Sequence, residues 1–174
     1  MSQLRIVAEL MAIAATTAPK AKGENFITIR IVEGEDLTRL AEAMREHGRL
    51  LGKPQGWERD AKNVADSDCV VLIGLKEAKV AALNCSACGA ETCIRPNTLE
   101  GEFRGPQCAW RLVDLGIAVG SAVKLASLLN VDNRVMYRIG VGARRCGLSD
   151  ADVVLGIPLS ATGKSIYFDR PPIT

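Results

Sequence analysis

The sequence predicts a three-layer arrangement of helices and strands, of the α/β or α+β class, formed by a single domain over residues 1–174. Segments with the apolar spacing of helices alternate with short apolar runs typical of strands, the order expected for such layers. The 174 residues lie within the usual length of one domain, and 48% of them are hydrophobic, enough to build one core. The formal net charge of +2 is too small for a disordered chain of this composition.

A helix, a strand and a second helix are expected in the first third of the chain. Apolar side chains recur at helical spacing over residues 3–16 and again over 36–47, where Gly48 is a natural stop. Residues 26–32 alternate isoleucine with polar side chains, as a strand with one buried face does. His47, the lone histidine, lies where a helix dipole favours a cation, so we interpret it as a capping residue and not a catalytic one.

The middle of the chain contains a polar stretch, an apolar stretch and a cysteine-rich stretch in succession. We expect residues 52–66 to form a polar loop in which Trp57 serves as an interface anchor. Residues 69–75 are apolar throughout, which predicts a strand buried on both faces. Residues 84–108 hold four cysteines and have little periodicity, so they are expected to form an irregular cysteine-rich loop inserted within the domain.

Residues 109–129 are predicted to form a long helix, about 30 Å at 1.5 Å per residue. This segment is apolar nearly all round, which predicts a buried helix at the centre of the core. Asp114 and Lys124 lie within it and would be costly in lipid, so we expect no membrane span. Asp114 is also spaced to pair with Arg111 three residues earlier.

The C-terminal part is expected to contain one more helix and two strands. The helix spans 132–146, with a polar start at Asp132, Asn133 and Arg134 that resembles a cap. Residues 153–157 are an apolar run typical of a buried strand, and residues 165–170 are expected to form a last strand or extended tail.

Composition excludes several classes of function. The 22 basic and 20 acidic residues leave little excess charge to follow a phosphate backbone, and only 4% of the residues are aromatic, so nucleic acid is not an expected partner. One histidine excludes a multi-histidine metal site. Six cysteines in a chain long enough to fold without disulfides, with no recognisable secretory leader, indicate a reducing, cytoplasmic location.

Four of the six cysteines follow a spacing that suits metal chemistry. Cys85, Cys88, Cys93 and Cys108 form the pattern C-x2-C-x4-C-x14-C. A short loop can supply three corners of a 4Fe-4S cluster, and a fourth thiolate can come from farther along the chain. Zinc is the alternative metal, although four-cysteine zinc sites usually have two C-x2-C pairs. Cysteines that pack without any metal are a further alternative, and this is our interpretation of Cys69 and Cys146.

The surroundings of Cys108 favour a thiolate. This residue directly precedes the long predicted helix, where free backbone N–H groups stabilise an anion. Arg95, Arg104 and Arg111 are near enough in sequence to offset the charge of a cluster, and the alternative is that they are solvated surface residues. Trp110 is expected either to shield the cluster or to be an ordinary core aromatic.

A family resemblance is carried by five segments, residues 14–23, 84–89, 114–123, 131–137 and 155–164. In them the chain resembles a family of small bacterial and archaeal ferredoxin domain-containing proteins, whose function is not established. Its four-cysteine run also resembles the 4Fe-4S domain in the large subunit of the corrinoid iron–sulfur protein. The family resemblance implies that Cys85, Cys88, Cys93 and Cys108 are the cluster ligands.

The order of elements is also similar to that of nitroreductase-type flavoproteins. A first helix, a basic segment, a long central helix and a late Gly-x-Pro strand end occur in both, which implies a nitroreductase-like sheet. The resemblance implies FMN as a second cofactor, with Lys20, Lys22, Gly120 and Lys164 as candidate contacts, and a homodimer. The arginine-serine-arginine signature of those flavoproteins is replaced here by residues 16–20, Thr-Thr-Ala-Pro-Lys.

Together these features predict an iron–sulfur redox protein that transfers electrons, or a small oxidoreductase that also binds a flavin. The alternative is a non-enzymatic binding module in which zinc or a cluster stabilises the cysteine-rich loop. The sequence names neither a substrate nor a redox partner.

Overall fold

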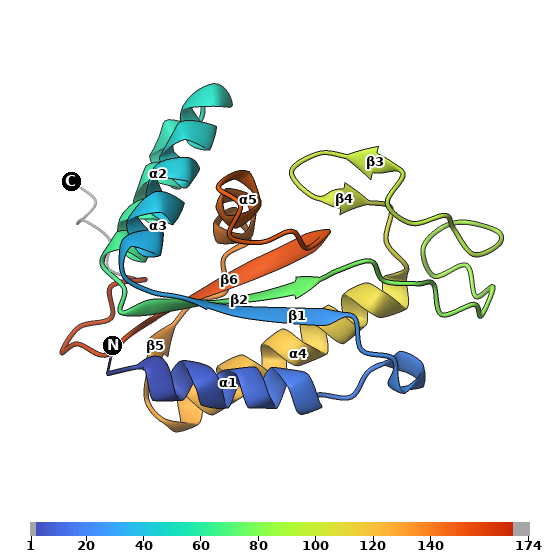
Figure 1. The fold of residues 1–174 in the computed structure, drawn as a ribbon, viewed down its shortest axis with the longest axis horizontal. Helices are drawn as coiled ribbons and strands as arrows, with labels where there is room; N and C mark the ends of the chain where they lie inside the picture. The colour runs from blue at the N-terminus through green and yellow to red at the C-terminus, as the bar shows by residue number, and fades with distance from the viewer. Residues whose placement is uncertain (1–2, 169–174) are drawn as a thin grey trace.

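The computed structural model describes residues 3–168, and in them one four-stranded sheet lies between two layers of helices (Figure 1). Every neighbouring strand pair is antiparallel. The strand order across this sheet is β1 (Ile27–Val32), β2 (Cys69–Leu75), β6 (Val153–Ser160) and β5 (Asp132–Asn133). One face is covered by α1 (Arg5–Thr17) and α4 (Ala109–Leu128), and the other by α2 (Glu35–Leu50), α3 (Pro54–Ala65) and α5 (Tyr137–Arg145).

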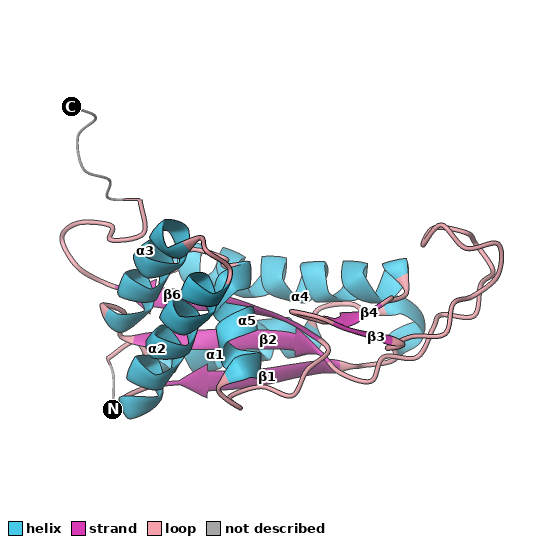
Figure 2. Ribbon diagram, turned by 90° about the horizontal axis from the view of Figure 1, so that it is seen from above, coloured by secondary structure: helices cyan, strands magenta, loops and turns pink. Residues whose placement is uncertain are grey.

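Two short elements complete the description. The 3-10 turn η1 (Ala21–Gly23) follows α1, and a small separate hairpin of β3 (Leu99–Glu100) and β4 (Arg104–Gly105) precedes α4. Figure 2 shows that the segment between β2 and α4 extends beyond one end of the sheet.

Strand β2 divides the core into two halves. Cys69, Val71 and Ile73 point into the half under α1 and α4, whereas Val70 and Leu72 point into the half under α2, α3 and α5. All seven residues of the strand are buried. The prediction of a strand buried on both faces is therefore confirmed, and the reason is that helices cover both sides of an antiparallel sheet.

The long helix has the predicted place in the chain but buries only one side. Leu115, Ala118 and Ala122 pack against the sheet and α1. The opposite side carries large apolar side chains that are 39–68% exposed, namely Leu112, Val113, Ile117, Leu128 and Leu129. The helix is therefore apolar all round without being buried all round. Within residues 3–168, no helix has both the length and the apolar character needed to cross a membrane.

Residues 52–66 are not a loop, as predicted, but mostly the helix α3. Pro54 occupies the first turn, where its missing N–H costs nothing. Trp57, Ala61 and Val64 recur at helical spacing and are buried in the core, so Trp57 is not an interface anchor. Gly48 of α2 is required by this packing, because a Cβ there would lie 2.4 Å from the Cβ of Trp57.

The predicted cap at His47 is also wrong. Helix α2 continues to Leu50, so His47 and Gly48 lie inside it. The imidazole is buried, packs edge-on against Trp57, and its Nε2 lies 2.7 Å from Oε1 of Glu102. A partner 55 residues away determines the role of this histidine.

The C-terminal elements begin and end differently from the prediction. Asp132 and Asn133 pair with the end of β6 as the short strand β5, and α5 begins only at Tyr137. Strand β6 continues beyond the predicted residue 157 to Ser160. Residues 165–168 form no strand, and the rest of the predicted last strand lies outside the described residues.

A buried ion pair joins α4 to two distant segments. The Arg111 guanidinium is completely buried, lies 3.1 Å from Asp114, and also pairs with Glu24. It donates to the carbonyl oxygens of Lys79 and Ala21 at 2.8 and 2.9 Å. The expected pairing of Arg111 with Asp114 is confirmed. Arg111 ties the first residue of η1 and the residue after η1 to the start of the cysteine-bearing segment, residues 76–108 between β2 and α4.

Removing this guanidinium should cost much of the stability of the fold. Arg111→Met leaves the Asp114 carboxylate buried without its cation, so we expect the free energy of unfolding to fall by about 3–5 kcal/mol. Arg39→Met is the matched control, because Arg39 and Asp36 form an ion pair of the same sequence spacing in which Arg39 is 56% exposed. That change should cost less than about 1 kcal/mol. Urea denaturation followed by circular dichroism measures both, and equal losses would contradict the role of Arg111.

Candidate functional site

The four cysteines singled out by their spacing line one hollow. Cys85, Cys88 and Cys93 lie in the middle of the segment between β2 and α4. Cys108 is the residue just before α4. Cys85 and Cys88 are exposed, Cys93 is half-buried and Cys108 is buried. The rest of the wall is mainly apolar, with contributions from Val80, Leu83, Ile94, Ala109 and Trp110. The structure thus brings together thiols from two separate parts of the chain.

Left-handed backbone conformations shape the loop that carries three of these thiols. Asn84, Ser86 and Gly89 have φ angles of 47°, 55° and 86°. The Gly89 N–H donates to the Ser86 carbonyl at 2.9 Å and closes a turn that follows Cys85 and contains Cys88. Glycine adopts such an angle at no steric cost, which explains its place in this turn.

Several N–H groups point at the sulfur atoms. The Asn84 backbone N–H donates to Sγ of Cys93 at 3.4 Å, and the Trp110 indole N–H donates to Sγ of Cys85 at 3.2 Å. The Cys93 N–H in turn donates to the Asn84 side chain at 3.1 Å. Hydrogen bonds from the Ala87 backbone and from Trp110 lower the pKa of the Cys85 thiol. These contacts favour the thiolate, the form that binds metals.

The two remaining cysteines have a different environment. Burial raises the pKa of the Cys69 thiol to about 12, and burial also raises the pKa of the half-buried Cys146 thiol. Both lie in the core or against it, away from the hollow. Their surroundings agree with the interpretation that they pack without taking part in chemistry.

The side chains around the hollow do not converge on a single point. Within residues 3–168, no group of three or more His, Cys, Asp or Glu side chains is gathered closely enough to hold one metal ion. The four thiols instead line different parts of the hollow, with Cys108 buried, Cys93 half-buried, and Cys85 and Cys88 exposed.

The candidate arginines differ in their surroundings. Arg111 is buried against Asp114 and Glu24, and Arg104 pairs with Glu100. Arg95 is exposed. Trp110, by contrast, is 40% exposed, lines the hollow and contacts Cys85, so it borders the site and is not a core aromatic.

The candidate flavin contacts lie in separate places. The Lys20 ammonium donates to three carbonyl oxygens at the end of α1, and burial lowers its pKa. Lys22 donates to the Ala81 carbonyl, which borders the hollow. Gly120 lies on the exposed side of α4. Lys164 follows the end of β6, whereas Lys20 and Lys22 precede β1, so the length of the sheet, about 20 Å, separates them.

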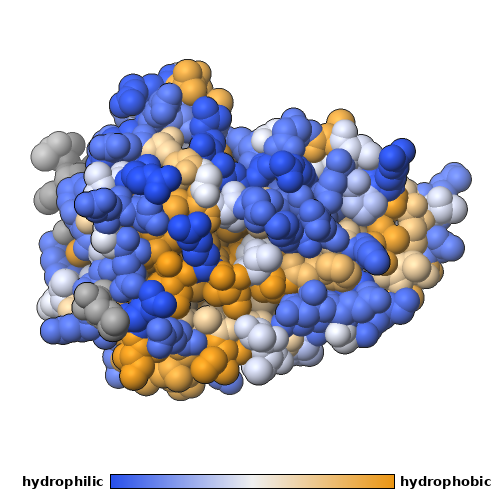
Figure 3. Space-filling view, viewed as in Figure 1, coloured by the Kyte–Doolittle hydropathy of each residue, from blue (hydrophilic) through white to orange (hydrophobic). Residues whose placement is uncertain are grey.

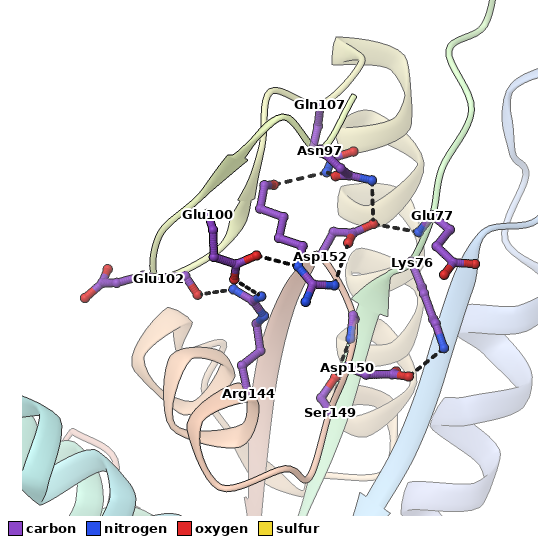
Figure 4. A network of polar contacts seen from close by, with 12 residues as sticks. Lys76, Glu77, Asn97, Glu100, Glu102, Gln107, Arg144, Ser149, Asp150 and Asp152 are labelled. Carbon is purple, nitrogen blue, oxygen red and sulfur yellow. Dashed lines mark hydrogen bonds and ion pairs between the residues drawn. The ribbon is translucent and has the colours of Figure 1, made fainter. Parts of the chain in front are cut away.

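Sequence reasoning missed the residues that fasten the cysteine-bearing segment to the sheet. Asp152, just before β6, contacts Glu77 and Asn97, and Asn97 contacts Gln107 beside Cys108 (Figure 4). None of these four residues belongs to a motif, and they come from three stretches of the chain. Only their proximity in the fold reveals them.

Solved structures with a similar fold include nitroreductases, some of them described with FMN. A nitroreductase with bound FMN from Desulfitobacterium hafniense has a TM-score of 0.61, with 12% sequence identity over 98% of this chain and 82% of that one. An FMN-dependent nitroreductase from Mycobacterium smegmatis, in complex with NADPH, has a TM-score of 0.58, with 13% identity over 97% and 84% of the two chains. At this identity the similarity establishes the fold alone, and it confirms the predicted nitroreductase-like sheet.

Sequence comparison identifies the family. A model for uncharacterized proteins containing a ferredoxin domain matches residues 104–170, which include Cys108 and follow the other three thiols of the hollow. A protein from Archaeoglobus fulgidus, itself described as uncharacterized, is 48% identical over 172 residues, which cover 97% of this chain and 92% of that protein. Because the similarity extends along nearly the whole chain, the protein belongs to the family of uncharacterized proteins containing a ferredoxin domain.

Proposed function

We propose that the protein is an iron–sulfur redox protein in which Cys85, Cys88, Cys93 and Cys108 bind a 4Fe-4S cluster. The single observation that carries the proposal is that these four thiols, from two separate parts of the chain, line one hollow. A cluster of this kind supplies one-electron transfer. We also propose a cytoplasmic location, because a reducing compartment keeps thiols available for metal binding.

The donor set fits a cluster. Thiolates are the ligands that iron–sulfur clusters use, and each thiolate binds a different iron atom, so the sulfurs surround a body instead of converging on a point. N–H donors to Cys85 and Cys93 would stabilise bound sulfur, and Cys108 lies at the N-terminus of α4, where the helix dipole favours an anion. Zinc, which would draw all four sulfurs to about 2.3 Å from one ion, is the alternative.

Exposure of part of the site supports exchange of electrons with another molecule. Cys85 and Cys88 are exposed, whereas Cys108 is buried against the fold. The buried side anchors the site in the protein, and the exposed side leaves a short path to a redox partner or substrate. Trp110 and Leu83, 40% and 55% exposed, flank this opening and exclude part of the solvent.

A second candidate function is that of a small oxidoreductase with both a cluster and FMN. The observation that favours it is the fold, since solved structures of similar fold are described as FMN-containing enzymes. The exposed Gly120 and the basic Lys20 and Lys22 near η1 are the candidate contacts. Lys20 already donates to three carbonyl groups, so it would need to exchange those partners to bind a phosphate.

We further propose a homodimer formed through the outer side of α1 and α4. Ile6 and Ile13 of α1 are 65% and 60% exposed, and these two helices pack side by side. Figure 3 shows apolar side chains gathered along the lower edge of the molecule, over α1. On α4, a Cβ added at Gly116 or Gly120 would meet no neighbouring atom within 4 Å, so packing within one chain does not require glycine there. A second copy would cover this apolar surface.

Iron and acid-labile sulfide should be found together in protein purified without oxygen. We expect Cys88→Ala to lose most of both, because a three-thiolate site holds the cluster weakly, while Cys146→Ala should retain both. Measuring iron, sulfide, zinc and flavin per chain distinguishes the candidates. One zinc per chain without sulfide would reject the cluster, and flavin with iron and sulfide would support the oxidoreductase.

Cys85 should be the most reactive thiol of the metal-free protein near neutral pH. The pKa of Cys85 is lowered, so at a pH below the ordinary pKa of a cysteine a larger fraction of this thiol is ionised than of an unperturbed one. Cys69 is buried, and its pKa is about 12. Alkylation with iodoacetamide followed by peptide mass spectrometry measures the order in which the thiols react. Trp110→Phe removes one donor to the sulfur and should slow the modification of Cys85. A rate unchanged by this substitution would contradict the role of the indole N–H.

Disrupting the apolar surface should separate the dimer. Ile13→Glu places a charge in the proposed interface, and we expect a monomer by size-exclusion chromatography with light scattering, where the unmodified protein is a dimer. Leu50→Glu is the matched control, since Leu50 is 66% exposed but lies on α2, on the other side of the sheet. A monomeric unmodified protein, or loss of the dimer in both variants, would reject this interface.

A further inference from the structure

A buried carboxylate holds both ends of the cysteine-bearing segment. Asp152 is 1% exposed and lies immediately before β6. Its Oδ2 accepts hydrogen bonds from the Glu77 backbone N–H at 2.6 Å and from the Asn97 amide at 3.1 Å (Figure 4). Its Oδ1 lies 3.6 Å from the Arg104 guanidinium. Glu77 precedes Cys85, and Asn97 and Arg104 follow Cys93, so one side chain joins the start of the segment to its end.

The backbone of Asp152 connects the sheet to the same segment. Its N–H donates to the carbonyl of Leu75, the last residue of β2, at 2.8 Å. Its carbonyl accepts from the Arg104 N–H, also at 2.8 Å. The residue is therefore fixed to the sheet while it holds the segment, and its carboxylate has little freedom to move.

A chain of polar contacts continues from Asp152 to Cys108. The Asn97 side chain accepts a hydrogen bond from the Gln107 amide, and the Asn97 N–H donates to the Pro106 carbonyl at 3.3 Å. Gln107 also donates to the Arg104 carbonyl at 3.1 Å. Gln107 is adjacent to Cys108, so these contacts connect the backbone beside this buried thiol to Asn97 and, through Asn97, to Asp152.

The charge of Asp152 matters because the site is buried. A carboxylate removed from water is costly unless it is paired, and hydrogen bonds to a charged acceptor are roughly twice as strong as neutral ones. Asparagine in this place would keep the size of the side chain but offer one acceptor oxygen, and its NH2 group would face Glu77, Asn97 or Arg104, which are all donors. The network is thus built for an anion.

We propose that Asp152 is a positioning residue of the cysteine site, which sets the place of Cys108 relative to Cys85, Cys88 and Cys93. The inference rests on the proposed function, since it gives this residue its purpose toward a bound cluster. Residues that orient metal ligands without touching the metal commonly change metal affinity about 10–100-fold when they are replaced. Asp152 contacts no candidate ligand directly and acts through Asn97 and Gln107.

Asp152→Asn tests this role against Asp150→Asn. Asp150 is two residues away, its side chain is 77% exposed, and it pairs with Lys76, so it is a control of the same chemistry. After anaerobic reconstitution with iron and sulfide, the chelator concentration that removes half of the iron should fall about 10–100-fold for Asp152→Asn. The midpoint potential and the electron paramagnetic resonance spectrum of the reduced protein should also change. Asp150→Asn should match the unmodified protein in all three measurements.

Asn97→Gly provides a second route to the same effect. Glycine tolerates the φ of 60° found at this residue, so the backbone is preserved while the link between Asp152 and Gln107 is removed. We expect a change in iron retention similar to that of Asp152→Asn, and a double variant no worse than the stronger single one. Simple addition of the two effects would contradict a shared chain of contacts.

A readout without metal separates this inference from the proposed function. In metal-free protein, Cys108 is buried, and we expect Asp152→Asn but not Asp150→Asn to make it react severalfold faster with a maleimide. If the unmodified protein holds neither iron nor sulfide, the proposed function fails and Cys108 reactivity alone decides the positioning role. If Asp152→Asn matches Asp150→Asn in iron retention, spectrum, potential and Cys108 reactivity, the inference is overturned.

Discussion

The buried guanidinium of Arg111 is the constraint on which one half of the molecule depends. A cation without solvent contact is tolerated only where acceptors surround it, and here these are Asp114, Glu24 and the carbonyl groups of Ala21 and Lys79. Apolar packing is not directional, whereas a guanidinium donates along fixed directions. The Arg111 donors therefore fix the start of α4 against Ala21 and Glu24, which follow α1. They also hold Lys79, at the beginning of the cysteine-bearing segment, against α4.

The cysteine-bearing segment is accordingly held at its ends and open in its middle. Arg111 holds Lys79 on one side, and Asp152, through Asn97, holds the stretch that leads to Cys108 on the other. Between them the loop around Cys85 and Cys88 is exposed. A site with rigid ends loses less conformational entropy when it binds a cofactor than a free loop would. The same arrangement leaves the thiols of Cys85 and Cys88 exposed, as the proposed exchange of electrons requires.

Helix α4 explains why an apolar sequence need not mean a buried helix. Its small residues, such as Ala118 and Ala122, let α4 pack closely on α1 and the sheet. Leu112, Val113 and Ile117 form a second apolar side that one chain leaves exposed. An exposed apolar surface of this kind costs free energy in water, and a second copy would remove the cost. One side of the helix is used within the chain, and the other is the surface through which we propose that the homodimer forms.

The sequence by itself determined the elements whose burial follows a local period. The apolar run of β2, the stripes of α1 and α2, and the spacing of the four thiols are local patterns, and the structure has all of them. Helix α3 was not predicted because only a few of its residues are apolar, and its polar outer side dominates the composition. The tertiary structure alone decided that Asp132 pairs with Ser160, that His47 meets Glu102, and that Asp152 holds the cysteine-bearing segment. A periodic pattern records which side of an element is buried, whereas the partner of a polar group depends on distant residues that only folding brings near.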